Sequence, residues 1–159
     1  MVIVAKSNDI KYGDRLHVTI DGRLVTIFRD KKTGELSAMD SVCYHAAGPL
    51  TNGDIVDIED LNITVVACPH HKYMVSIHDG SRIYQKVDII AGKPQQGDWV
   101  KGKVVQRVHE VSENKSNGDI NVILNEEDVV YPSDADSNKC YHFFKIHSSH
   151  SSLYTAHIL

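Results

Sequence analysis

The sequence has few cysteines and no long hydrophobic run, and each absence excludes a class of protein. It has three cysteines in 159 residues, an odd number whose spacing does not form a regular disulfide framework. This excludes a secreted fold held together by disulfides and indicates a reducing compartment. Eighteen apolar residues never run together, and no basic segment followed by an apolar core opens the chain. We therefore expect no membrane association, no signal peptide and a cytoplasmic location.

Positive charge is also scarce. Seventeen Lys and Arg stand against twenty-one Asp and Glu, a net charge of −4, and no basic run is longer than Lys31-Lys32. Nucleic acid is therefore not an expected partner. The length suits one globular domain that folds without disulfides, and hydrophobic and charged contents of 42% and 24% are ordinary for such a domain.

Up to about residue 125 the sequence has no apolar repeat of helical period. Short β-type runs alternate with turn residues instead, and Asp21-Gly22 and Asn117-Gly118 are typical of turns between paired strands. This pattern predicts an all-β fold. The expected strands are Val2 to Ala5, Arg15 to Ile20, Arg23 to Phe28, Glu35 to Met39, Asn62 to Ala67, Tyr73 to Ile77, Val104 to Val111 and Asp119 to Leu124.

Two segments carry turn-like or polar sequence. The stretch from Asp88 to Lys103 contains three glycines and a proline, which predicts a mostly irregular loop. Residues 126–159 are expected to form a C-terminal extension, partly packed, with its last dozen residues poorly ordered. Its thiol, Cys140, lacks a partner motif, and its histidines have serine neighbours rather than carboxylates, so no metal site is expected there. These histidines are His142, His147, His150 and His157.

Two of the three cysteines each lie beside a histidine, in the pattern C-x-H, then 22 residues, then C-x-x-H. Gly48-Pro49 and Pro69 favour tight loops that could bring both pairs to one centre. Thiolate and imidazole suit both zinc and iron, so the set allows a mononuclear Cys2His2 zinc site or a two-iron cluster. Incidental histidines beside two buried cysteines are the remaining alternative. The candidate ligands are Cys43, His45, Cys68 and His71.

The pattern resembles the Rieske [2Fe-2S] signature, C-x-H followed at variable distance by C-x-x-H. The flanking residues AAGPL after His45, and the alternating strand that runs to Gly80, agree with it. CYHAAGPL, CPHHKY and QRVHEV are similar to the small soluble Rieske domain-containing proteins, from about Val2 to Leu124. The resemblance implies an antiparallel β-sandwich over residues 1–125, with a cluster-binding subdomain at about 41–80 forming one tip.

The resemblance also implies a role for each candidate ligand. Cys43 and Cys68 would ligate the buried iron, while His45 and His71 would ligate the outer iron near the surface, where electrons enter and leave. Replacing two thiolates by imidazoles raises the reduction potential of such clusters to between about −150 and +300 mV.

This chain departs from the high-potential members of the family. Those members carry two further cysteines that form a disulfide, and a serine that donates to a cluster sulfur. Here Gly48, His70 and Tyr73 stand at these positions. Hydrogen bonds to sulfur stabilise the reduced, more negative state of a cluster. Because this chain offers fewer of them, a low-potential, ferredoxin-like cluster is expected.

By resemblance, the chain is a monomeric one-electron carrier between a flavin- or NAD(P)H-dependent reductase and an oxygenase or other acceptor. About thirty-five residues follow Leu124, too few for a mononuclear-iron catalytic domain, so no substrate site of its own is evident and its status as an enzyme is open. The alternatives are an electron-input subunit of a multicomponent oxygenase or reductase, and a zinc-stabilised Cys2His2 binding module. Tyr84 and Trp99 either cover the cluster or pack as core aromatics.

Overall fold

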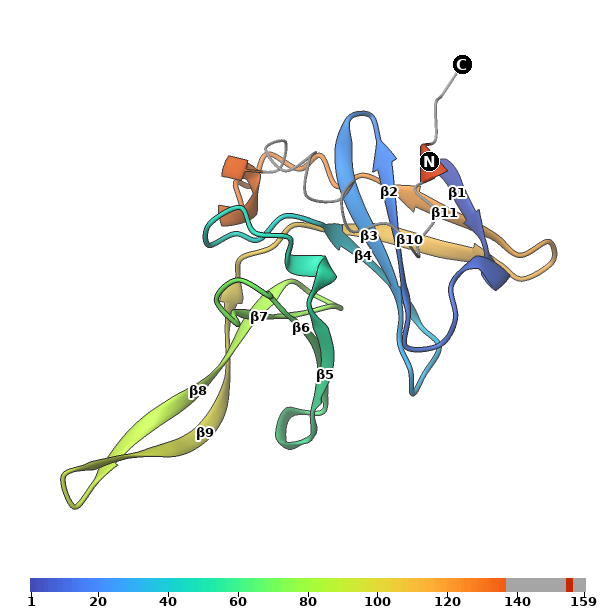
Figure 1. The fold of residues 1–159 in the computed structure, drawn as a ribbon. Helices are drawn as coiled ribbons and strands as arrows, with labels where there is room; N and C mark the ends of the chain where they lie inside the picture. Colours follow the sequence, from blue (N-terminus) through green and yellow to red (C-terminus); the bar gives the residue numbers. More distant parts are fainter. Residues whose placement is uncertain (137–153, 156–159) are drawn as a thin grey trace.

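A computed structural model describes residues 1–136 and 154–155 of the chain. Figure 1 shows that nearly all the regular structure in these residues is β-strand, which confirms the all-β prediction. No helix in this part of the chain is long and apolar enough to cross a membrane. The strands are β1 (Val2–Lys6), β2 (Arg15–Ile20), β3 (Arg23–Arg29), β4 (Leu36–Asp40), β5 (Asp54–Ile58), β6 (Ile63–Ala67), β7 (Met74–Ser76), β8 (Ser81–Ile90), β9 (Lys93–Val104), β10 (Val108–Asn114), β11 (Asp119–Ile123) and β12 (Tyr154–Thr155). Single 3-10 turns connect several of them, namely η1 (Ser7–Asp9), η2 (Leu50–Asn52), η3 (Glu59–Leu61) and η4 (Pro132–Asp136).

The strands form two sheets. The larger has the order β1-β11-β10-β4-β3-β2-β12 and is antiparallel except for β12, which pairs parallel with β2. The smaller, β5-β6-β7-β8-β9, is antiparallel throughout. Because β4 pairs with β10, the smaller sheet is an excursion of the chain between two neighbouring strands of the larger one.

The expected turn between β2 and β3 is confirmed. Asp21 and Gly22 both have positive φ, 49° and 80°, and the register pairs Ile20 with Arg23 directly across the turn. Such a two-residue turn matches the twist of the strands it joins. Leu16, Val18 and Ile20 are consequently all buried, so the alternation in the sequence corresponds to one inward-facing side of β2.

Two hydrophobic clusters form most of the core. One fills the interior of the larger sheet, where Val18, Val25 and Ile27 are completely buried. The other lies at the junction of the sheets and combines Phe28 from β3 with residues of β6 and β7, and it includes both Cys43 and Cys68. The two cysteines therefore belong to the packing that joins the sheets, where close packing restricts side-chain movement.

The prediction of an irregular loop from Asp88 to Lys103 is wrong. β8 and β9 form a long hairpin, here called the arm, which projects from the body of the protein in Figure 1. Its tip is a two-residue turn, Ala91-Gly92, with φ of 51° and 76°. The glycines and Pro94 misled the prediction because β9 is an edge strand, and an edge strand tolerates residues that leave one side of the ladder unpaired.

Two further strand predictions need correction. The run Val104 to Val111 is not one strand, because β9 ends at Val104 and β10 begins at Val108 while the chain crosses between the sheets. At this crossover, the N–H groups of Val105 and Gln106 both donate to the carbonyl of Gly80, at 2.9 and 3.2 Å. Strand β5 was not predicted at all, since its two aspartates mask the alternation of a half-exposed edge strand.

Candidate metal centre

The first candidate pair lies in the loop that follows β4, called here the first cysteine loop (residues 41–53). The N–H of Cys43 donates to the carbonyl of Gly48 at 2.8 Å, and the N–H of Ala47 donates back to the carbonyl of Cys43 at 3.1 Å. Ala47 has a φ of 51°. These two hydrogen bonds close a tight turn whose apex residues, His45 and Ala46, are exposed.

The second cysteine loop (residues 68–73) joins β6 to β7 and repeats this geometry. The N–H of Cys68 donates to the carbonyl of Tyr73, and the N–H of Lys72 donates to the carbonyl of Cys68, both at 2.8 Å. Lys72 has a φ of 59°. The backbone of each cysteine is thus hydrogen-bonded to the residues four and five positions further on. The two loops therefore share one backbone conformation although their sequences differ.

The two thiols lie together in the core. Cys43 and Cys68 are 2% and 1% exposed, and a hydrogen bond between them raises the pKa of Cys43 and lowers the pKa of Cys68 to about 5. Backbone N–H groups also lower the pKa of each thiol, which stabilises sulfur in its anionic, metal-binding form. These groups come from the residues two and three positions further on, His45 and Ala46 for Cys43, and His70 and His71 for Cys68.

The two histidines form a separate, exposed pair. The rings of His45 and His71 lie 5.0 Å apart at an angle of 87°, and His45 also stacks on Tyr73 at 4.2 Å. Within the described residues, no three His, Cys, Asp or Glu side chains gather closely enough to hold a single metal ion. The four candidate ligands instead form a buried sulfur pair and an exposed imidazole pair, which is how a cluster with unlike ligands on its two metals would use them.

Gly48 lies where the two loops approach each other. A Cβ atom at this position would lie 3.2 Å from Sγ of Cys68 and 3.0 Å from Nδ1 of His70. Space beside the sulfur is therefore limited, and a larger residue would have to displace one of them. The contact also brings together Gly48 and His70, the two positions that hold the disulfide in the high-potential proteins.

Tyr44 carries a polar atom that the sequence analysis missed. Its hydroxyl is buried and has no hydrogen-bond partner among the described residues. Burial and the nearby charges of Cys43 and Cys68 raise the pKa of Tyr44 to about 12, with Arg82 acting in the opposite direction. The hydroxyl is therefore a neutral donor, and Tyr44 packs against the core cluster that contains both cysteines. A buried hydroxyl that stays unpaired costs free energy. An inorganic cluster would remove this cost, because its sulfides accept hydrogen bonds.

The first cysteine loop is supported from behind by the crossover residues. The side-chain amide of Gln106, completely buried, donates to the carbonyls of Asp40 and Val42 at 2.8 and 2.7 Å. The N–H of Asp40 donates to the carbonyl of Arg107 at 3.0 Å. The residues that lead into Cys43 are thus held by neighbours more than sixty positions later in the sequence.

An ion-pair network extends this support to the segment after β11. Arg23 makes a bidentate contact with Asp40, at 2.6 Å for each bond, and also donates to Asp134 in η4 at 2.9 Å. Arg107 donates twice to the same Asp134 carboxylate at 2.8 Å. Hydrogen bonds from Arg107, opposed by partial burial, lower the pKa of Asp134 to about 2. The network connects η4 to the start of the first cysteine loop.

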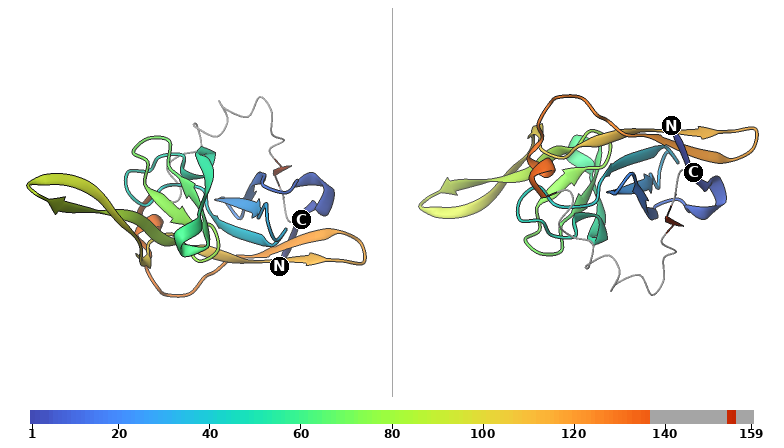
Figure 2. Two further views of the ribbon diagram at one scale, coloured as in Figure 1. Left: turned by 90° about the horizontal axis from the view of Figure 1, so that it is seen from below. Right: turned by 90° about the horizontal axis from the view of Figure 1, so that it is seen from above.

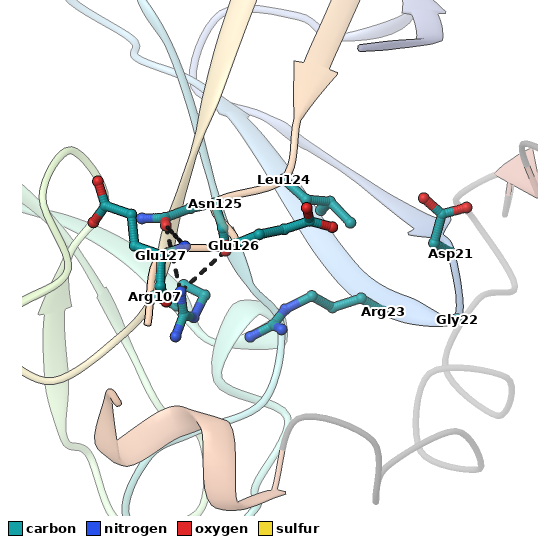
Figure 3. A pocket seen from close by; sticks show the side chains of 8 residues that line it. All are labelled: Asp21, Gly22, Arg23, Arg107, Leu124, Asn125, Glu126 and Glu127. Carbon is teal, nitrogen blue, oxygen red and sulfur yellow. Dashed lines mark hydrogen bonds between the residues drawn. The ribbon is translucent and has the colours of Figure 1, made fainter. Parts of the chain in front are cut away.

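A cavity of about 580 Å3 lies apart from the candidate ligands, between the β2–β3 turn and the segment after β11 (Figure 3). Arg107 and Arg23 lie along it, but the carbonyls of Asn125 and Glu127 accept hydrogen bonds from Arg107 and Arg23 pairs with carboxylates. Because both guanidinium groups already have partners, the cavity offers no free cation to a ligand.

A second cavity, of about 350 Å3, opens beside His71. Tyr84 and Trp99 both line it, so they border the candidate site, and Trp99 also packs against the buried Ile83 of β8. Cys140 and the four C-terminal histidines of the sequence analysis lie outside the described residues.

Comparisons with known proteins agree with this arrangement. Residues 2–127 match the family described as soluble Rieske-type ferredoxins. The chain is 36% identical over 135 residues to a human Rieske domain-containing protein. The alignment covers 84% of this chain and 80% of the human protein.

Two solved structures have a similar fold. The ferredoxin of carbazole 1,9a-dioxygenase from Nocardioides aromaticivorans IC177 superposes with a TM-score of 0.54 at 22% identity, over 78% of this chain and 97% of that one. A protein assigned as an NADH-dependent nitrite reductase small subunit from Mycobacterium tuberculosis gives a TM-score of 0.55 at 19% identity, over 76% of this chain and 90% of that one. At such identities the likeness concerns the fold, and it confirms the Rieske-type architecture expected from the sequence.

Proposed function

The chain belongs to the soluble Rieske-type ferredoxins, and we propose that it holds a [2Fe-2S] cluster on Cys43, Cys68, His45 and His71 and carries single electrons. The separation of a buried sulfur pair from an exposed imidazole pair, on two loops of equal backbone geometry, carries this proposal. When bound, such a cluster supplies a one-electron redox couple.

The protein's own groups have distinct tasks in this proposal. Cys43 and Cys68 anchor the cluster inside the core that joins the two sheets, and the backbone N–H groups near them stabilise negative charge on sulfur. The exposed rings of His45 and His71 lie where a partner can approach. Tyr73, stacked on His45 at 4.2 Å, keeps one of these rings in place.

The proposed partners are a flavin- or NAD(P)H-dependent reductase as donor and an oxygenase or other redox protein as acceptor. The fold likeness to the ferredoxin of a carbazole dioxygenase supports an oxygenase as one of these partners. Electron carriers must bind and release partners quickly, so a monomer with transient contacts suits the role. We further propose a cytoplasmic location, in keeping with the small, odd number of cysteines, and no binding to nucleic acid.

We also propose a reduction potential in the lower part of the range of about −150 to +300 mV for clusters with two histidine ligands. Gly48 and His70 meet where the high-potential proteins have a disulfide, and Tyr73 replaces their donor serine. Among side chains, Tyr44 offers one hydroxyl donor that has no partner within the described residues. One hydrogen bond raises the potential less than several would.

Low-temperature EPR of the dithionite-reduced protein, with iron and zinc analysis, tests the proposal. We expect about two irons per chain and the low average g value typical of mixed cysteine and histidine ligation. Zinc without an EPR signal would instead establish a zinc-stabilised binding module. The second candidate, an electron-input subunit of a larger enzyme, is suggested by the fold likeness to a nitrite reductase small subunit, and stable co-purification with a flavoprotein or a mononuclear-iron protein would support it.

A further inference from the structure

The cavity beside His71 is a groove at the root of the arm. The second cysteine loop forms one wall and the β8 and β9 strands form the other, so the groove lies between a candidate ligand and the base of the arm. Its aromatic residues are Tyr73, Tyr84 and Trp99. Aromatic side chains offer large contact areas at small entropic cost, and they are enriched at the centres of protein interfaces.

The charge of the groove is opposite to that of the chain. Its lining residues include Lys72 and Arg82 but no aspartate or glutamate, although the whole chain has a net charge of −4. Lys72 and Arg82 are both exposed. A local positive potential in a concave, partly apolar surface attracts negatively charged partners more strongly than the same charges on a flat surface.

Arg82 differs from the other arginines of the protein. Its guanidinium lies 5.5 Å from the ring centre of Tyr73 and 4.9 Å from that of Tyr84, so two aromatic rings hold it in position. The side chains of Arg15, Arg23, Arg29 and Arg107 all donate hydrogen bonds, whereas the side chain of Arg82 has no hydrogen bond or ion pair within the described part of the chain. Its donors therefore remain available to a carboxylate, which a guanidinium can bind in a bidentate manner.

The face of β8 that carries Gln85 of the groove continues outward with Val87 and Ile89, while Ile90 lies on the opposite face. Val87, Ile89 and Ile90 of the arm are 67%, 69% and 55% exposed, and Figure 1 shows the arm standing away from the rest of the protein. A contact that spans the groove together with Val87 and Ile89 is larger than a small acid can cover. The occupant that fits is therefore a protein surface.

We propose that this groove docks an acidic redox partner, one of whose carboxylates pairs with Arg82 while apolar side chains of the partner cover Tyr84 and Trp99. The contact places the partner beside His71, the exposed end of the candidate centre. This inference deepens the proposed function and rests on it. A docking cation next to the site of electron exit gives the fast, salt-dependent association that a transient carrier requires.

The first test measures the charge at the site of electron exit. The reduced holoprotein is oxidised in a stopped-flow instrument by an anion, ferricyanide, and by a cation, tris(phenanthroline)cobalt(III). Arg82→Gln should slow the ferricyanide reaction roughly three- to tenfold at low salt and speed the cobalt reaction, because one nearby charge changes the encounter energy with a multivalent ion. At high salt the difference should largely vanish.

Lys115→Gln is the matched control, since it removes the same charge from an exposed position in the β10–β11 turn. Figure 2 shows that this turn and the arm point away from each other. The control should change both rates less than twofold, because its charge is screened over that distance. Equal effects of the two variants would mean that net charge alone matters, and this result would overturn the proposal.

The second test addresses the kind of partner. Trp99 is the only tryptophan of the chain, so indole fluorescence reports directly on the groove. Titration with poly-L-glutamate should give a saturable change that salt suppresses, that Arg82→Gln abolishes and that Arg82→Lys retains in part. No change with poly-L-glutamate, a response to poly-L-lysine instead, or binding that is indifferent to Arg82 would each refute an acidic partner.

The two proposals fail in different ways. Iron analysis and EPR on the same samples decide whether the cluster is present, and they do not depend on Arg82. If the cluster is absent, the proposed function fails, while the fluorescence titration still decides whether the groove binds an acidic surface. If the cluster is present and Arg82→Gln behaves like Lys115→Gln, only the docking proposal fails.

Discussion

Replacing Asp134 by asparagine should measurably destabilise the protein, because this carboxylate connects η4 to the support of the first cysteine loop. It accepts hydrogen bonds from Arg107, Arg23 and the N–H of Tyr131, all between 2.7 and 2.9 Å. The pKa of Asp134 falls from 3.8 to about 2, and each unit corresponds to about 1.4 kcal/mol of differential stability. The upper limit is therefore about 2.5 kcal/mol.

Partial exposure reduces this figure. The side chain of Asp134 is 22% exposed and solvent weakens its ion pairs, so we expect Asp134→Asn to cost about 1–2 kcal/mol at pH 7. For a protein of this size that corresponds to a fall in Tm of about 3–6 °C. Urea unfolding followed by circular dichroism measures the free energy directly.

The pH dependence gives the reasoning a second test. Because the folded pKa lies below the unfolded value, the carboxylate stabilises the protein fully above about pH 5 and loses this contribution as the pH falls toward 2. The difference between wild type and Asp134→Asn should therefore shrink by about half near pH 3. Asp128→Asn, at an exposed position in the same segment, is the control. A cost no larger than that of the control, or one that does not change with pH, would show that Asp134 does not stabilise the fold through these ion pairs.

Three further changes test the candidate centre. Tyr44→Phe removes the unpaired hydroxyl and should lower the midpoint potential by about 50 mV, as loss of one hydrogen bond to sulfur predicts, without changing iron content. His71→Cys should shift the visible spectrum and lower the potential, since a second anionic ligand disfavours reduction, and unchanged spectra would contradict the assignment. Gly53→Ala should cost at least about 3 kcal/mol in urea unfolding, because its Cβ would lie 1.7 Å from the carbonyl oxygen of Ala67.

The matched controls use the same residue types elsewhere. Tyr12→Phe changes an exposed tyrosine outside the candidate centre and should leave the potential unchanged. His78→Cys alters a histidine outside the predicted ligand set and should preserve the spectrum. Gly102→Ala places its Cβ no closer than 3.3 Å to a neighbour, so it should cost far less than Gly53→Ala.

Several parts of the fold could be predicted because they depend on residues close together in the chain. Asp21-Gly22 forms its turn through local backbone preferences, and the alternation in β2 needs only one side facing a core. The arm could not be predicted in the same way. Gly92 and Pro94 indicate a loop unless one knows that β9 is an edge strand, and edge position is a property of the whole sheet.

For the candidate site, the sequence by itself determined the family and predicted the ligand set, because both depend on residue types at short spacings around Cys43 and Cys68. Only the tertiary structure decided what surrounds those residues. The contact of Gly48 with His70, the unpaired hydroxyl of Tyr44 and the aromatic rings under Arg82 all depend on how separate loops and strands pack. Such contacts arise from the close packing of distant segments, and no local pattern encodes them.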